Sequence, residues 1–196
     1  MLLVITAVAL VASVPLAGGR LGRLADIRLR ALWAVFASVL IQVGIITVAP
    51  GGSHLLHVAL HLISYLLAAW FVVANRHVTG IFVVAFGAAL NVLAISVNGG
   101  VMPASAAAMR IAGLHPSGAF NNSAPVLHPH LAFLGDVIPV PGPWPIGNVL
   151  SIGDLVIFIG ALVVLHVACG SRVARLRPNR RSARISRDAR GSTAGV

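Results

Sequence analysis

Five long apolar runs, separated by short polar links, constrain the fold of this chain more than any other feature. Hydrophobic residues make up 58% of the sequence and charged residues 9%, against about 25% in soluble domains. Each run is close to the roughly 20 residues that an α-helix needs to cross a hydrocarbon layer of about 30 Å. The sequence therefore predicts an all-α polytopic membrane protein with five transmembrane helices, at about residues 2–17, 31–49, 55–74, 78–97 and 150–168.

Arginines set the predicted orientation. All fourteen cationic side chains are arginine, and thirteen of them lie at residues 20–30, at Arg76 or in the tail, which leaves only Arg110 elsewhere. Because Lys and Arg are enriched in cytoplasmic loops, the N-terminus is expected outside and the C-terminus inside. We expect a multi-pass protein of the bacterial cytoplasmic membrane, with a membrane domain over residues 1–169 and a disordered cytoplasmic tail over residues 170–196.

The segment at residues 98–149 is too polar and too rich in proline to cross a membrane. Asn98-Gly99-Gly100 is expected to end the fourth helix, and Ser105 to Ala112 to form a short helix that Gly113 ends. The remaining prolines predict chain without regular structure. Its apolar side chains are too numerous for a solvated linker, so we expect an ordered, irregular extracytoplasmic cap over the outer end of the helices.

The third apolar run carries a polar stripe. His54, His57 and His61 are spaced i, i+3 and i+7, which places them on one helix face with Ser64 and Tyr65. Neutral imidazole binds metals and titrates near physiological pH, so a metal site, a haem ligand or a proton-handling cluster are functional interpretations. Interhelical hydrogen bonding is the structural alternative. A haem shared between His61 and His166 is disfavoured. His61 is expected about 10 Å below the outer end of its helix and His166 about 21 Å below the outer end of its own, a difference of about 10 Å.

A divalent metal such as zinc is the cofactor that the outer residues suggest. His128 and His130 flank a proline, and together with Asp136 and with His54 and His57 they supply donors of the kind that zinc prefers. Their spacing matches no established metal motif. Two surface histidines held by proline are the alternative.

Two aspartates and one amide complete the candidate ligand-binding or proton-handling residues. Asp136 lies in an apolar stretch, and an ion pair with Arg110 is its structural alternative. Asp154 fits a capping box with Ser151 at the start of the last helix. Asn91 shares one face of the fourth run with small residues, a pattern typical of close helix packing, and the others on this face are Gly80, Gly87, Ala94 and Asn98.

The arginines of the tail are expected to contact anionic lipid. Each basic residue near such a surface contributes roughly 1 kcal/mol. The tail has no interleaved aromatic side chains, which argues against nucleic-acid binding. The expected lipid contacts are Arg172, Arg175, Arg177, Arg180 and Arg181.

Four short motifs occur in a fixed order: Asn98-Gly99-Gly100-Val101-Met102-Pro103, Asn122-Ser123, Leu134-Gly135-Asp136-Val137-Ile138-Pro139 and Ser151-Ile152-Gly153-Asp154. In this order they resemble an uncharacterised family of small bacterial polytopic membrane proteins, domain of unknown function 5317. The resemblance covers roughly residues 1–169. It implies that residues 98–149 and their flanking helices are the distinctive part of the family, and it implies no activity.

The sequence supports one leading hypothesis and two alternatives. The chain has no phosphate-binding loop, GxSxG, HExxH or CxxC motif. The leading hypothesis is an accessory, interaction or small-ligand-binding protein that acts through its cap, with a partner membrane protein or a second copy as partner. The alternatives are a metal-dependent membrane enzyme or metal-binding protein, and a proton-coupled transporter that uses the histidine stripe.

Overall fold

The computed structural model describes residues 2–47, 54–114, 123–124, 126, 128–142 and 147–176. Each apolar run contains one long helix, and these helices are α1 (Leu2–Leu16), α2 (Leu32–Thr47), α3 (His54–Ala74), α4 (Ile81–Val97) and α6 (Ile152–Ala168). The shorter helical segments are the 3-10 helices η1 (Leu21–Asp26), η2 (Ala132–Leu134) and η3 (Val173–Leu176) and the helix α5 (Ala106–Ile111). The described strands are β1 (Met102–Pro103), β2 (Ser123–Ala124), β3 (Ile138–Val140) and β4 (Asn148–Leu150).

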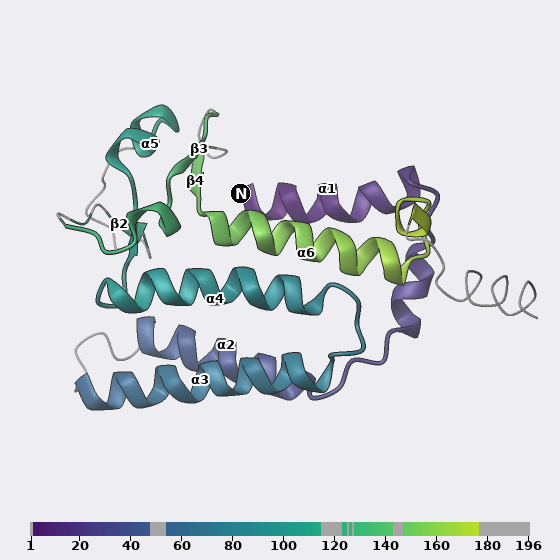
Figure 1. The fold of residues 1–196 in the computed structure, drawn as a ribbon, viewed down its shortest axis with the longest axis horizontal. Coiled ribbons are helices and arrows are strands. Elements are labelled where there is room, and N and C mark those ends of the chain that lie inside the picture. Colours follow the sequence, from purple (N-terminus) through teal and green to yellow (C-terminus); the bar gives the residue numbers. More distant parts are fainter. Residues whose placement is uncertain are drawn as a thin grey trace, which may run out of the picture.

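The long helices run alongside one another (Figure 1). Helix α4 packs against α6, α2 packs against α3, and α1 lies against α6. The described parts of residues 98–149, which we call the cap, gather at one end of the helices, and η1 and η3 lie at the other end. The cap thus sits where α4 ends and α6 begins.

Glycines allow α4 and α6 to approach each other closely. A Cβ atom at Gly87 would lie 2.6 Å from the carbonyl oxygen of Gly153, and a Cβ atom at Gly160 would lie 2.6 Å from the amide nitrogen of Val84. Larger side chains at these positions would force the two backbones apart. The prediction that small residues on the fourth run mediate close helix packing is confirmed.

The prediction of five transmembrane helices is wrong. Within the described residues, no helix combines the length and the apolar character that crossing a membrane would require. Helices α1, α2, α4 and α6 have 15 to 17 residues, and at 1.5 Å per residue they measure about 22–26 Å, less than the roughly 30 Å of a hydrocarbon core. Helix α3 has 21 residues, and its first twelve include the three histidines with Ser64 and Tyr65.

The all-α prediction also needs correction, because the cap contains paired strands. Strands β3 and β4 are antiparallel, with Ile138 opposite Leu150 and Val140 opposite Asn148, and β1 pairs in parallel with β2. Pro139 sits in the middle of β3 opposite Val149. Proline is tolerated there because a two-stranded sheet consists of edge strands, whose outer side needs no hydrogen-bond donor.

The ends of two helices are located as expected. Helix α4 ends at Val97, and Gly99 and Gly100 follow with left-handed φ angles of 68° and 90°. Helix α5 begins after Ser105, whose side chain accepts a hydrogen bond from the Ala108 amide, and Gly113 follows it with a φ angle of 72°.

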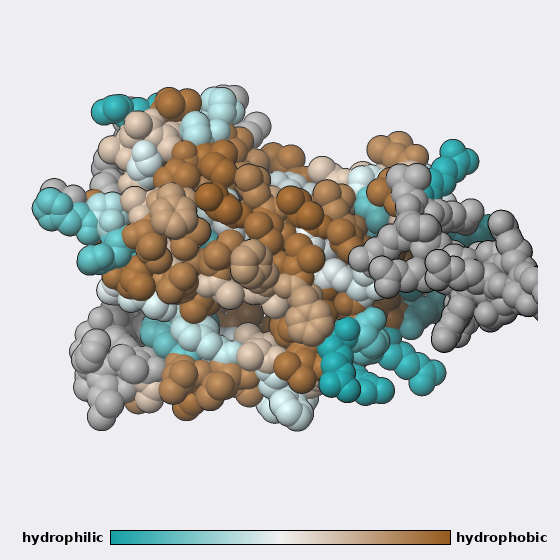
Figure 2. All heavy atoms as spheres, in the orientation of Figure 1, coloured by the Kyte–Doolittle hydropathy of each residue, from teal (hydrophilic) through white to brown (hydrophobic). Residues whose placement is uncertain are grey.

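Apolar side chains cover much of the outer surface of the long helices. Figure 2 shows hydrophobic side chains along the visible helical face and hydrophilic ones near its two ends. Trp33, Leu40 and Trp70 each expose more than half of their surface. Single exposed apolar residues are ordinary in proteins, but a continuous apolar surface marks a place where something other than water makes contact.

Candidate functional site

A cavity of about 510 Å³ lies between α4, α6 and the cap, and we call it the cap pocket. Three of the predicted site residues, Asn91, Asp136 and Asp154, line it. Its volume falls in the range typical of small-molecule sites. The other lining residues are Leu2, Ile95, Met102, Asn148, Val149, Leu150, Ile157 and Phe158.

Asp154 is held by the start of α6. The Ser151 side chain accepts a hydrogen bond from the Asp154 amide over 2.9 Å, and Asp154 Oδ2 accepts one from the Ser151 amide over 3.0 Å. This reciprocal arrangement is a capping box, as the sequence predicts. A carboxylate here also interacts favourably with the positive end of the helix dipole. The role of Asp154 as a helix cap is confirmed.

Asn91 ties this cap to α4. Its Nδ2 donates to Asp154 Oδ1 over 2.8 Å, and its Oδ1 accepts from the Ser151 hydroxyl over 2.8 Å. The Ser151 oxygen already accepts from the Asp154 amide, so the hydroxyl proton is directed to Asn91, which fixes the orientation of the amide. The three side chains therefore form a closed triangle that joins the middle of α4 to the first turn of α6.

Asp136 enters the pocket from the cap. Its backbone is held on both sides, because its amide donates to the Pro103 carbonyl over 2.9 Å and its carbonyl accepts from the Ser105 amide over 3.0 Å. The preceding Gly135 has no space for a side chain, since a Cβ atom there would lie 2.9 Å from Pro103 Cγ. Asp136 is 6% exposed, whereas Arg110, which the sequence suggested as its ion-pair partner, is exposed in the last turn of α5.

The cap pocket has an acidic, hydrogen-bonding part and an apolar part. It is lined by two of the four aspartates of the chain and by two amide side chains, and none of its described lining residues is basic. Each Asp154 oxygen accepts one hydrogen bond from Asn91 or Ser151, while a carboxylate oxygen can accept two. The arrangement is suited to binding a hydrogen-bond donor or a cation that also carries an apolar group.

The described side chains of the histidine stripe, His61, Ser64 and Tyr65, are not among the lining residues of the cap pocket. The described part of the stripe faces α2, because Gln42 Nε2 donates to the Ser64 hydroxyl over 2.8 Å and Ser64 donates in turn to the His61 carbonyl over 2.7 Å. The rings of His61 and Tyr65 stack with their centroids 5.9 Å apart. The side chains of His54 and His57 lie outside the described residues.

The predicted metal ligands are not brought together in the part of the chain that the structure describes. No group of three or more His, Cys, Asp or Glu side chains there is placed to hold a metal ion. His128 and His130 are exposed, whereas Asp136 is buried. The backbone of His130 is bound instead by Asn98, with two hydrogen bonds of 2.8 Å. A metal site that includes His54 and His57 stays a prediction.

Of the predicted lipid contacts, the structure describes the side chain of Arg172, which is exposed between α6 and η3 at the end of the helices far from the cap. The side chain of Arg175 and the residues Arg177, Arg180 and Arg181 lie outside the described residues, as does the rest of the tail.

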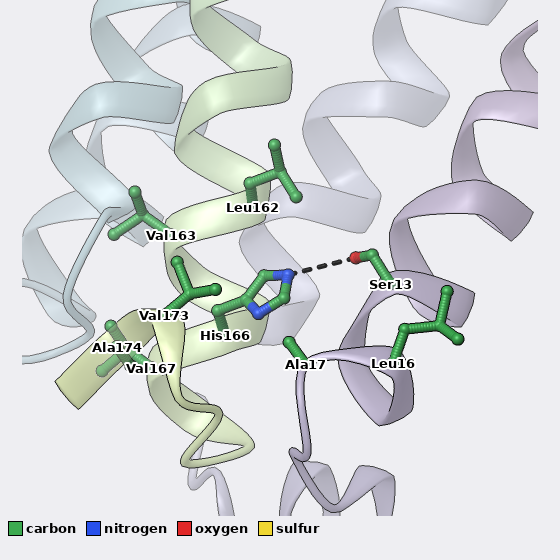
Figure 3. A pocket seen from close by; sticks show the side chains of 9 residues that line it. All are labelled: Ser13, Leu16, Ala17, Leu162, Val163, His166, Val167, Val173 and Ala174. Atoms are coloured by element: carbon green, nitrogen blue, oxygen red, sulfur yellow. Dashed lines mark hydrogen bonds between the residues drawn. The ribbon is translucent and has the colours of Figure 1, made fainter. Parts of the chain in front are cut away.

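A second pocket, which sequence reasoning missed, lies between α1, α6 and η3, and we call it the α1–α6 pocket. Its volume is about 650 Å³. The His166 ring reaches from α6 to Ser13 of α1 (Figure 3). The residues that line the pocket are Ser13, Leu16, Ala17, Leu162, Val163, His166, Val167, Val173 and Ala174. In the sequence, only His166 could have pointed to this pocket. A lone histidine near the end of a predicted helix does not by itself indicate a pocket.

Comparison with known proteins finds relatives without an assigned activity. Residues 26–166 match the sequence model of DUF5317, described as a family of unknown function. An uncharacterized protein of Thermotoga maritima is 34% identical over 101 residues, which make up 52% of this chain and 59% of that protein. The match thus spans less than two thirds of the relative. No solved structure matches the chain.

Proposed function

The chain belongs to DUF5317, a family of unknown function, and we propose that it is a small-ligand-binding protein whose cap pocket holds an organic cation with an apolar body. One observation carries the proposal. Asp136 from the cap, Asp154 from α6 and Asn91 from α4 converge on one cavity whose remaining walls are largely apolar. The cap pocket also lies within the matched residues, apart from Leu2.

Electrostatics favour a cation over an anion. The described lining residues carry two carboxylates and no basic side chain, so the potential in the pocket is negative. Asp136 is almost fully buried, and charge interactions are stronger where water is excluded. An ammonium group that donates to these carboxylates forms charge-assisted hydrogen bonds, which are roughly twice as strong as neutral ones.

The apolar walls favour an organic ligand over a bare metal ion. Ile95, Met102, Ile157 and Phe158 offer carbon surface and no oxygen from a side chain. A small inorganic cation needs six or more oxygen ligands, or a set of His and Cys ligands, and would leave this surface uncovered. In an amine with an aryl or alkyl group, the ammonium group pairs with the carboxylates and the apolar group covers the apolar walls.

Titration calorimetry with phenethylammonium tests the proposal. We expect saturable binding by the full chain and no binding of 2-phenylethanol, which has nearly the same shape and no charge. Asp136→Asn is expected to weaken binding at least about 30-fold, since removal of one partner from a buried charged pair costs roughly 2 kcal/mol or more. Asp26→Asn is the matched control, because Asp26 is exposed in η1 at the opposite end.

Two results would contradict the proposal. Equal binding of phenethylammonium and 2-phenylethanol would show that charge plays no part. Equal weakening by Asp136→Asn and Asp26→Asn would show that the cation responds to the net charge of the chain and not to the cap pocket.

A further inference from the structure

The α1–α6 pocket is built at the end of the helices where arginines gather. Arg20 and Arg23 lie in and beside η1, and Arg172 directly precedes η3. The backbones of these segments are tied to the walls of the pocket. The Arg172 amide donates to the Ala17 carbonyl over 3.0 Å, and the Arg20 amide donates to the Cys169 carbonyl over 3.0 Å.

The Arg172 side chain packs beside a chain segment that lines the pocket. A Cβ atom at Gly18 would be 3.4 Å from Arg172 Nε, so this side chain packs over Gly18, the neighbour of the lining residue Ala17. Arg23 approaches Gly170 in a similar way. Both guanidinium groups belong to exposed residues, and no aspartate is among the lining residues of this pocket. Arg172 is not itself a lining residue, but it directly precedes the lining residue Val173, and we call the border of the pocket at Arg172 its cationic rim.

The interior of the pocket is apolar apart from two polar side chains, Ser13 and His166, which are hydrogen-bonded to each other. The Ser13 hydroxyl donates to the Leu10 carbonyl over 2.6 Å, and its oxygen lies 3.1 Å from His166 Nε2. A hydroxyl has one proton, so His166 Nε2 is the donor to Ser13, and His166 Nδ1 lies 2.8 Å from the Ser171 hydroxyl oxygen. With a proton on Nε2, the imidazole cannot deprotonate Ser13, which favours binding over nucleophilic catalysis.

We propose that the α1–α6 pocket binds a fatty acid carboxylate. The acyl chain lies against the apolar lining residues Leu16, Leu162, Val163 and Val167, which Figure 3 labels, and the carboxylate lies at the guanidinium of Arg172. A volume of about 650 Å³ suits a ligand of this size. A cationic rim above an apolar interior selects a single negative charge at one end of an apolar molecule. Arginine is suited to the carboxylate because its planar group can donate two parallel hydrogen bonds.

Photolabelling of the full chain tests this site. The probes are dodecanoate and dodecylammonium, each with a diazirine at the end of the chain, applied with an excess of nonionic detergent that competes for exposed apolar surface. Mass spectrometry then locates the label. Dodecanoate is expected to label peptides that contain residues 13–17 and 162–167, at least about fivefold more than dodecylammonium does, the ratio expected of one exposed charge pair.

Two pairs of variants separate the pocket from the surface. Leu162→Trp fills the cavity, and Leu155→Trp is its control two turns earlier on α6. Arg172→Gln removes the charge at the rim, and Arg76→Gln is its exposed control at the turn after α3. The pocket variants should each lower dodecanoate labelling about fivefold or more, and the controls should leave it unchanged.

The proposal is overturned if dodecanoate and dodecylammonium label equally, or if label spreads over α2 and α3 as strongly as over residues 162–167. It is also overturned if Arg172→Gln and Arg76→Gln have equal effects. Because Arg172 is exposed, its variant tests the site even if Leu162→Trp fails to fold.

Discussion

Asn98 repeats at the end of α4 the contact geometry that Asn75 forms at the end of α3. Asn75 Nδ2 donates to the Phe71 carbonyl four residues earlier and to the Arg30 carbonyl, and Asn75 Oδ1 accepts from the Arg30 amide, each over 2.8 Å. Asn98 forms the same bonds with Ala94 and with both backbone groups of His130, over 2.7–2.8 Å. Each amide thus closes one helix and fixes a remote segment at its end.

The two asparagines differ in burial, which predicts different energetic effects. Asn75 is fully buried, so Asn75→Ala should lower the free energy of unfolding by about 2–4 kcal/mol, because it removes three hydrogen bonds and leaves a cavity where the side chain was. Asn98→Ala should cost no more than about 1 kcal/mol, because water replaces its partners at an exposed site. Chemical denaturation of the two variants measures both values, and equal losses would contradict the role given to burial.

Gly153→Ala is expected to separate α4 from α6. Its Cβ atom would lie 2.7 Å from the Gly87 carbonyl oxygen and would collide with Asn91 Oδ1. We expect a loss of about 1–3 kcal/mol in the free energy of unfolding, as is usual for overpacking. Gly44→Ala in α2 is the control, because nothing lies within 4 Å of a Cβ atom there. It should stabilise the chain by up to about 1 kcal/mol through helix propensity. A neutral Gly153→Ala would show that the two helices can shift apart at no cost.

The triangle of Asn91, Ser151 and Asp154 should behave as one unit. In a double-mutant cycle of Asn91→Ala and Ser151→Ala, we expect a coupling free energy of about 0.5–3 kcal/mol, since the two side chains share a hydrogen bond and a common partner. Thermal or chemical denaturation of the four proteins gives the value. Additive effects within about 0.3 kcal/mol would mean that the three groups act separately.

His166→Phe should loosen α1 more than any other helix. The substitution removes the hydrogen bonds of the ring to Ser13 and Ser171, while a ring of similar size still fills the space. Amide hydrogen exchange in α1 is expected to rise about tenfold, which corresponds to a loss of about 1.4 kcal/mol. His77→Phe at an exposed position is the control. Unchanged exchange in α1 would show that apolar packing alone holds this helix.

The sequence located the long helices well because their signals are local. Runs of apolar residues, the Ser151 capping box and the glycines after Val97 all act within a few residues. Whether each apolar run forms a helix long enough to cross a membrane could not be inferred in this way. The apolar pattern predicts that the fourth helix begins at residue 78. Residues 78–80 form a turn instead, in which Gly80 has a φ angle of 98°, and the helix begins at Ile81. An apolar turn residue and an apolar helix residue look alike in a sequence.

The candidate site was predicted in its parts and not in its assembly. The polarity of Asn91, Asp136 and Asp154 within apolar stretches predicts each of them as a candidate ligand-binding or proton-handling residue. Their meeting depends on contacts such as the bond from Asn91 to Asp154, which joins residues 63 positions apart. No local pattern encodes such a separation. The sequence does not predict the strands of the cap for a related reason. Strands of three residues are defined by hydrogen bonds to a partner strand and not by a pattern within their own residues.

Helix α1 forms part of the wall of both cavities. Leu2 lines the cap pocket, and Ser13, Leu16 and Ala17 line the α1–α6 pocket about 20 Å away along the same helix. A rigid helix shared by two sites is a physical connection between them. If a fatty acid at one end tilted α1 and so changed the affinity for an amine at the other, the amine would have to change the affinity for the fatty acid by the same factor. Helix α1, which precedes the residues that match the family, is thus the described helix whose displacement at one pocket would move a wall of the other.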